Sequence, residues 1–208
     1  MSTAERSANR RPTASELALT SDLDRIAASA KEGVTFICGF PASGKSTAAR
    51  YLAQRTDAII LDKDTFAPDL EESVMAELSG NPHDRDSDVY MRVVNPHIYT
   101  ALVTEALSVG QRTPVVVDAP FIGHVRAAAR QKLSLAEYFK SIAPVSPPPV
   151  RTVWISADPD LIRERMARRG APRDACKLAD WYTYRAEVLD SGIEASAEAV
   201  VDYVVRNA

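Results

Sequence analysis

Short apolar runs alternate with longer amphipathic stretches along most of this chain. Runs rich in β-branched residues predict buried strands, and they fall at 34–38, 58–61, 114–117, 152–155 and 201–205. Apolar residues recurring every three or four positions predict helices over 15–31, 45–56, 69–79, 88–109, 125–142, 159–169 and 175–190. Strands alternating with helices indicate a parallel sheet covered on both faces. The expected fold class is therefore α/β, with three layers.

The same pattern suggests where the folded part begins and where one helix is interrupted. Residues 1–13 are polar, so we expect a disordered N-terminal extension. A chain of 208 residues suits one domain, and we assign it to residues 14–208. Pro96 lies within the helical pattern of 88–109. Because proline cannot donate a backbone hydrogen bond, the sequence predicts a kink or a restart there.

Residues 39–46 match the full pattern G-x-x-x-x-G-K-[ST], the phosphate-binding P-loop. The chain holds only eight glycines, and two of them fall at the required positions. In such a loop, backbone N–H groups hold the phosphates of a nucleoside triphosphate, Lys45 reaches the β- and γ-phosphates, and Ser46 reaches Mg²⁺. We therefore predict an ATP and Mg²⁺ site made by Gly39, Ala42, Ser43, Gly44, Lys45, Ser46 and Thr47.

Acidic residues follow two other predicted strands. Asp62 and Asp64 come after 58–61, and Asp118 comes after 114–117. Because parallel strands bind ligands at their carboxyl ends, these carboxylates should share one edge with the P-loop. We predict Asp118 as a Mg²⁺ ligand, directly or through water, Asp62 as an outer contact to the metal, and Asp64 as the base that takes a hydroxyl proton. The alternative for each is an ordinary turn or helix-capping aspartate.

Five arginines lie between Arg163 and Arg173, and Gly170 and Pro172 interrupt the helix that carries them. Phosphoryl transfer needs positive charge opposite the P-loop lysine, and mobile lid arginines supply it. We predict a lid over about 163–178 in which Arg165, Arg169 and Arg173 contribute to catalysis or ATP binding. Two alternatives remain, a solvated helix face and a patch for a nucleic-acid backbone.

The acceptor should lie between the second and third strands and just beyond Asp118, where polar residues gather in a long loop and after a strand. The candidates are Asp64, Arg85, Tyr90, Arg92, His124 and Arg126. For most of them the alternative is a surface or capping residue.

Composition restricts the partners and the compartment. The net charge is −3, so nucleic-acid or membrane binding has no bulk electrostatic support. Cys38 and Cys176 form no C-x-x-C pair, which argues against a zinc-stapled lid or a disulfide framework and fits a reducing cytosol. No apolar segment at the N-terminus suggests a signal peptide, and no stretch approaches the length of a membrane span. We expect a cytoplasmic protein of open oligomeric state.

The order of P-loop, Asp62-Lys63-Asp64, Asp118 and an arginine-rich segment resembles the P-loop kinases of small molecules over roughly residues 34–205. That group includes gluconate and shikimate kinases, the kinase domain of polynucleotide kinase and the zeta-toxin kinases. The resemblance implies a P-loop NTPase sandwich, with Asp64 contacting the acceptor hydroxyl and lid arginines holding ATP. The chain departs from adenylate kinases, since it has no clear nucleoside-monophosphate site and no cysteine lid.

The sequence therefore predicts an ATP-dependent phosphotransferase that moves the γ-phosphoryl group to a hydroxyl of a small molecule. Two alternatives stay open at this point. One is a kinase of a nucleic-acid end or a sugar-nucleotide. The other is a non-catalytic switch or binding module that responds to ATP.

Overall fold

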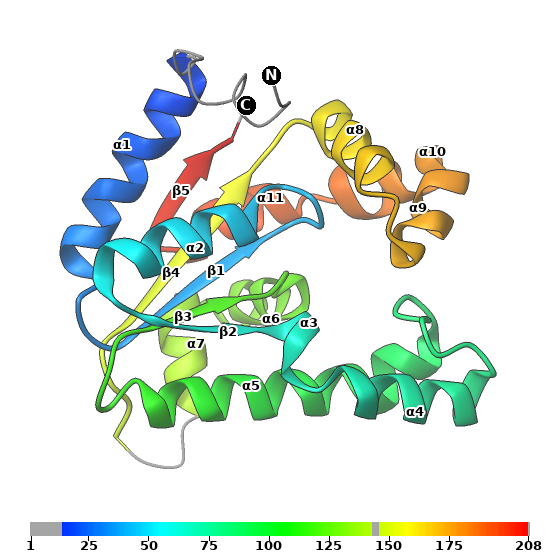
Figure 1. Ribbon diagram of the computed structural model, residues 1–208, viewed down its shortest axis with the longest axis horizontal. Helices are drawn as coiled ribbons and strands as arrows, with labels where there is room; N and C mark the ends of the chain where they lie inside the picture. Colours follow the sequence, from blue (N-terminus) through cyan, green and yellow to red (C-terminus); the bar gives the residue numbers. More distant parts are fainter. Residues whose placement is uncertain (1–13, 143–145, 208) are drawn as a thin grey trace, which may run out of the picture.

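Five parallel strands form one sheet in the computed structural model, which describes residues 14–142 and 146–207. They are β1 (Val34–Gly39), β2 (Ile59–Asp62), β3 (Val115–Asp118), β4 (Val150–Ser156) and β5 (Tyr203–Arg206). The spatial order is β2-β3-β1-β4-β5 (Figure 1). The predicted α/β class with a parallel sheet is confirmed. The predicted extension over 1–13 lies outside the described residues.

Helices cover both faces of this sheet, as the buried strands require. On one face, α1 (Ala14–Ser29) and α2 (Lys45–Thr56) pack through Leu23 and Leu52 against Ile37 of β1. The other face is covered by α5 (Asn95–Val109), α6 (Ile122–Gln131), α7 (Leu135–Ile142) and α11 (Ile193–Val200). Phe36, the neighbour of Ile37, belongs to this second core, where its ring stacks on Phe139 at 4.0 Å. Alternating strand residues therefore fill two separate cores.

Two groups of short elements lie beyond the carboxyl ends of the strands, at the right of Figure 1. One group is α3 (Lys63–Phe66), α4 (Pro68–Ser79) and the π-helix η1 (Tyr90–Val94). Met75 of α4 and Tyr90 of η1 form a small core with Ile98 of α5. The other is α8 (Pro159–Arg169), η2 (Pro172–Asp174), α9 (Ala175–Ala179), α10 (Trp181–Tyr184) and η3 (Arg185–Leu189). The predicted lid segment belongs to this second group.

The predicted helix over 125–142 is wrong in its extent, because the segment holds two helices. The first, α6, ends where Lys132 adopts a left-handed backbone (φ 58°). The second, α7, follows a reciprocal cap in which Glu137 N–H donates to Ser134 Oγ and the Ser134 N–H donates to Glu137 Oε2. Ser-x-x-Glu is a capping box, so the sequence carried a signal for this restart.

The remaining helical predictions differ in their outcome. Near Pro96 the chain restarts, as predicted: the Asn95 N–H bonds to Tyr90 O in a π-turn, directly before the proline that cannot donate. The predicted helix 175–190 is broken into α9, α10 and η3, and Asp180 caps α10 by accepting from the Thr183 N–H. Helix α11 was not predicted. Among the described residues, no helix combines the length and apolarity that a membrane span requires.

Candidate active site

The P-loop connects the end of β1, at the centre of the sheet, to the start of α2. Two glycines are required by close contacts. A Cβ on Gly39 (φ 145°) would lie 2.6 Å from the carbonyl oxygen of Ile155, and one on Gly44 (φ 105°) would lie 2.1 Å from Asn207 Nδ2. Strand order reverses at β1, and ligands of α/β sheets bind at such a point. The loop therefore occupies the position where a phosphate-binding site is expected.

Lys45 is buried at the first position of α2. Its Nζ donates to the carbonyl oxygen of Phe40 at 2.7 Å, within the P-loop itself. Burial lowers the pKa of Lys45 to about 8, although the carboxylates of Asp118 and Asp64 partly oppose the shift. The ammonium is thus held close to the space enclosed by the loop, where a triphosphate would compensate its charge.

Asp118 and Asp62 are paired in register on adjacent strands, so both carboxylates lie at the same edge as the P-loop. Asp118 is buried, and burial raises its pKa while Lys45 and the Ser46 hydroxyl work in the opposite direction. Asp62 also caps α3, because its carboxylate accepts from the Asp64 N–H at 2.9 Å. The alternative capping role is therefore observed at this residue, and the metal contact stays a prediction.

The chemistry of these side chains fits Mg²⁺. Ser46, Asp62 and Asp118 all line one cleft and offer hard oxygen donors, which Mg²⁺ prefers. Within the described part of the chain, no cluster of three or more His, Cys, Asp or Glu side chains is preformed to hold a metal. Mg²⁺ commonly uses few protein ligands and shares its coordination with water and substrate phosphates. The residues present suit that mode of binding.

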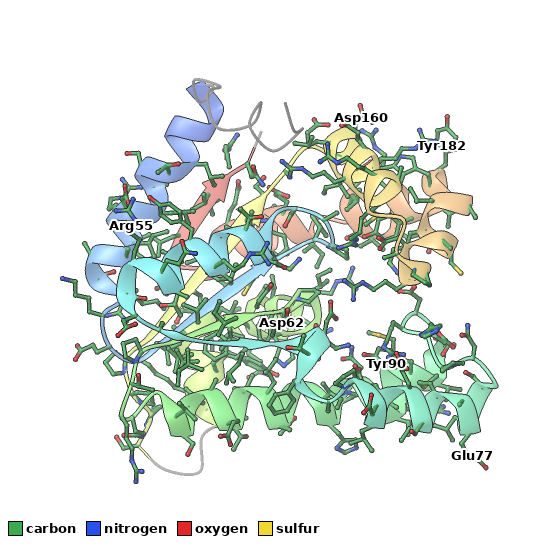
Figure 2. All side chains as sticks on the ribbon, in the orientation of Figure 1. Arg55, Asp62, Glu77, Tyr90, Asp160 and Tyr182 are labelled. Carbon is green, nitrogen blue, oxygen red and sulfur yellow. The ribbon has the colours of Figure 1, made fainter. Side chains whose placement is uncertain are left out.

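One cleft of about 1170 Å³ joins the P-loop to most of the predicted site residues. Pockets for one drug-sized ligand typically measure about 300–1,000 Å³, so the cleft is large enough for more than one ligand. Asp62 lies at the end of β2 and Tyr90 farther out, on the α4 side (Figure 2). The predicted residues that line the cleft are Ala42, Gly44, Lys45, Ser46, Thr47, Asp62, Asp64, Arg85, Tyr90, Asp118, His124, Arg126, Arg165, Arg169 and Arg173.

Three predicted residues do not line this cleft. Gly39 and Ser43 are buried inside the P-loop, and Ser43 Oγ has no hydrogen-bond partner among the described residues. Arg92 is exposed and is not among the residues that line the cleft. It follows Tyr90 by two residues in η1, and residues two apart in a helix do not share a face. Arg92 is therefore not brought together with the other acceptor candidates.

The three predicted lid arginines occupy different places. Arg165 lies beside the P-loop, where it donates to the carbonyl oxygen of Ser43 (3.2 Å) and to Asn207 Oδ1 (3.3 Å). Arg169 makes two hydrogen bonds to the buried carboxylate of Asp174 (2.8 and 2.9 Å). Arg173 reaches from η2 to the other wall, with its Nη1 2.7 Å from Asp64 Oδ2. The segment therefore contacts both the nucleotide side and the expected base.

The deeper wall of the cleft is aromatic. The His124 ring lies 5.1 Å from that of Tyr99 and 5.3 Å from that of Phe121, centroid to centroid. Burial lowers the pKa of His124 to about 4, so the ring is neutral at physiological pH. Arg126, one turn beyond Ile122, donates to Ser191 Oγ at 3.3 Å. The pocket thus combines apolar rings with one neutral imidazole.

Sequence reasoning missed several side chains that shape the cleft. Lys63, within the noted Asp62-Lys63-Asp64 segment, is buried and lies 2.8 Å from Glu71 of α4. A lysine directly after a strand, flanked by two candidate catalytic acids, is a signal that could have drawn attention to it. Asn207, whose Nδ2 donates to the Ser43 carbonyl at 2.7 Å, gave no such signal. The Tyr184 hydroxyl is also buried at the cleft, without a hydrogen-bond partner among the described residues.

Comparison with protein families gives a match to one family model, described as an AAA domain, over residues 34–189. No curated protein matches the chain. Several solved structures are similar at low identity. A shikimate kinase from Bacteroides thetaiotaomicron is 13% identical, with coverage of 83% of this chain and 85% of that one and a TM-score of 0.46.

Two further structures are similar at the same level. A gluconokinase from Sinorhizobium meliloti 1021 is 19% identical, covering 85% of this chain and 83% of that one, with a TM-score of 0.45. A chain from the PezAT chromosomal toxin-antitoxin system of Streptococcus pneumoniae is 16% identical, covering 93% and 77%, with a TM-score of 0.48. At these values, nothing about substrate follows from the likeness.

Proposed function

The chain belongs to the AAA domain family that matches residues 34–189, and from its cleft we propose that it transfers the γ-phosphoryl group of ATP to a hydroxyl of a small molecule. One observation carries the proposal: the P-loop, Asp118, Asp64 and the three lid arginines all line the same cleft. A nucleotide-binding module that acts only as a switch needs the first two features. It does not need the further carboxylate of Asp64 or the arginines of residues 163–173.

The P-loop side would bind the nucleotide. Backbone N–H groups of residues 42–47 hold the β- and γ-phosphates at the start of α2, where the helix dipole favours anions. Lys45 would leave the Phe40 carbonyl and pair with the phosphates, since a charged partner is stronger than a neutral one. Ser46, Asp118 and Asp62 would hold Mg²⁺. When bound, Mg²⁺ neutralises charge on the phosphate oxygens.

The opposite side would receive the acceptor. Its hydroxyl oxygen forms a bond to the γ-phosphorus, the bond from that phosphorus to the β–γ bridging oxygen breaks, and ADP leaves. The hydroxyl proton passes to the carboxylate of Asp64, which is about half exposed and lines the cleft. Besides Lys45, Arg165, which lies beside the P-loop, and Arg173, which contacts Asp64, would supply positive charge where negative charge develops.

A transfer screen tests this proposal. Purified protein, Mg²⁺ and γ-labelled ATP are incubated with hydroxylated metabolites and antibiotics, and with 5′-hydroxyl oligonucleotides and sugar-nucleotides as separate arms. We expect label on a small-molecule hydroxyl, and no label with Lys45→Ala. Label on an oligonucleotide or a sugar-nucleotide instead would favour the corresponding kinase. ATP binding without transfer to any acceptor would favour a switch.

A further inference from the structure

Three helices on the same face of the sheet, α5, α6 and α7, contribute one side of the cleft (Figure 1). Helix α7 contacts both of the others, and η1 leads directly into α5. Apolar and aromatic residues of these elements line the cleft, and we call them the apolar wall: Met91, Pro96, Tyr99, Ile122, Tyr138 and Ile142.

This side of the cleft holds almost no charge. Among the described residues, Arg126 is the only charged side chain that η1, α5, α6 and α7 contribute to the lining, and it donates to Ser191 Oγ at 3.3 Å. The side formed by α3, the following loop and the lid is charged, but its charges are paired. Arg173 of the lid contacts Asp64, for example. The cleft therefore has one side of matched charges and one uncharged side.

His124 adds a polar group to the uncharged side. Its ring lies 5.1 Å from that of Tyr99 and 6.0 Å from that of Tyr138. Because burial lowers the pKa of His124 to about 4, the neutral ring has one N–H donor and one acceptor nitrogen. Neither makes a hydrogen bond within the described part of the chain. Ligand pockets commonly combine an apolar lining with a few polar groups of this kind.

Part of the apolar wall remains accessible to solvent. The Met91 side chain is 50% exposed, and Ile122, Tyr138 and Ile142 are only partly buried. Apolar surface that stays exposed within a groove is typical of a ligand-binding site. The wall also adjoins the expected reaction centre, because α3, which carries Asp64, contacts α5. A molecule whose hydroxyl reaches Asp64 would therefore lie against these side chains.

We propose that the acceptor is an uncharged alcohol with an apolar, ring-containing body that binds to the apolar wall. This inference rests on the proposed function and adds the class of its acceptor. A wall without charge matches an uncharged body, and the rings of Tyr99 and Tyr138 favour another ring. A polyol or a sugar would bury many hydroxyl groups against side chains that cannot bond them, which is unfavourable. His124 would bond one polar substituent of the body.

Binding of a series of alcohols tests the inference without requiring transfer. The full-length protein is first saturated with Mg²⁺ and a non-hydrolysable ATP analogue, so that the P-loop is occupied. Sorbitol, gluconate, phenylethanol and naphthylethanol are then compared by ligand-observed NMR. We expect affinity to rise from sorbitol through phenylethanol to naphthylethanol, by about tenfold or more over the series, because each ring buries more apolar surface. Gluconate should bind no more tightly than sorbitol.

Variants connect this preference to the apolar wall. Met91→Gln should weaken naphthylethanol binding by about threefold. Leu78→Gln is the matched control, because Leu78 is similarly exposed (47%) but does not line the cleft. Tyr138→Ala should weaken binding by about tenfold, and Tyr138→Phe, which keeps the ring, should restore it. Affinity for the ATP analogue should stay the same in all four variants.

Three results would overturn the inference. The first is sorbitol or gluconate binding as tightly as naphthylethanol, and the second is no detectable binding of naphthylethanol. The third is naphthylethanol binding that is unchanged in both Met91→Gln and Tyr138→Ala. The proposed function fails separately: a protein that binds naphthylethanol through this wall but never transfers phosphate to any acceptor keeps the binding site and loses the kinase assignment. Transfer to polyols or sugars alone does the reverse.

Discussion

The guanidinium of Arg173 lies 2.7 Å from the carboxylate of Asp64, so the lid is paired with the residue expected to take the hydroxyl proton. Both side chains are more than 40% exposed, and ion pairs of that kind contribute little net free energy. Breaking this pair therefore costs little free energy when Arg173 binds a triphosphate, which carries more negative charge than one carboxylate. Without a nucleotide, one oxygen of the Asp64 carboxylate is paired with Arg173.

Replacing Asp64 tests its role as base. Asp64→Asn keeps the shape but removes the proton acceptor, so transfer should fall by roughly 10²–10⁴, or by less if the transition state is loose. ATP affinity should change little, because the carboxylate faces Arg173 rather than the P-loop. Single-turnover transfer and calorimetry measure the two effects. Asp62→Asn is the comparison, and it should weaken Mg²⁺ dependence instead. Transfer at the parent rate in Asp64→Asn would refute the assignment.

Replacing each lid arginine should have a different effect, because each one contacts a different group. Arg173→Ala should lower kcat more than it raises KM for ATP, if Arg173 meets charge that develops only in the transition state. Arg169→Ala should lower stability by about 1–3 kcal/mol, because it leaves the buried carboxylate of Asp174 without its two donors. Steady-state kinetics and urea unfolding distinguish the two. If kcat is unchanged in Arg165→Ala, Arg169→Ala and Arg173→Ala, the arginines have no catalytic role, and the alternative of a solvated helix face is favoured.

The P-loop side of the site could be predicted because its determinants are local. The motif has a fixed spacing within one loop, with Gly39, Gly44 and Lys45 at the required positions. The hydrophobic pattern alone predicts the strand before it and the helix after it. Asp118 and Asp62 were predicted to meet because parallel strands end at one edge, and the register pairs them directly.

The acceptor side was less predictable because its contacts join distant segments. Glu71 of α4 forms ion pairs with Lys63 of α3 and with Arg85 of the following loop. The hydrophobic pattern of the sequence does not indicate such contacts between segments. Arg169 lines the cleft, as predicted, but its guanidinium also binds Asp174, a residue that follows the left-handed turn at Gly170 (φ 60°). Arg92 was chosen by residue type, and a helical residue two positions after Tyr90 does not share its face.

Removal of metal should abolish transfer. Ser46, Asp62 and Asp118 offer only oxygen donors, which suits Mg²⁺, and the phosphates carry charge that must be neutralised for transfer. Excess chelator should reduce the rate to background, and added Mg²⁺ should restore it. Asp118→Asn should raise the Mg²⁺ concentration needed for half-maximal rate by about tenfold or more. Undiminished transfer in excess chelator would contradict the metal prediction.

Nucleotide binding should take up a proton at alkaline pH. Burial lowers the pKa of Lys45 to about 8, whereas a bound triphosphate favours the charged ammonium. Binding of ATP should therefore add roughly 0.7 proton at pH 8.5 and about 0.1 at pH 7. Calorimetry of Mg²⁺ and ATP in buffers of different ionisation enthalpy measures the uptake. A value that does not rise between these two pH values would contradict the assignment of Lys45 to the phosphates.

His124 should make the fold sensitive to mild acid. Burial lowers its pKa to about 4, against about 6.5 in the unfolded chain, so between these values the unfolded state binds more protons. Stability is then complete above pH 6.5 and falls as pH drops toward 4, by about 2 kcal/mol at pH 5. His124→Phe, whose ring suits the aromatic neighbours, should flatten urea-unfolding stability between pH 7 and 5. His97→Phe, at an exposed position of α5, should not, and an equal pH dependence in His124→Phe and the parent would show that another group is responsible.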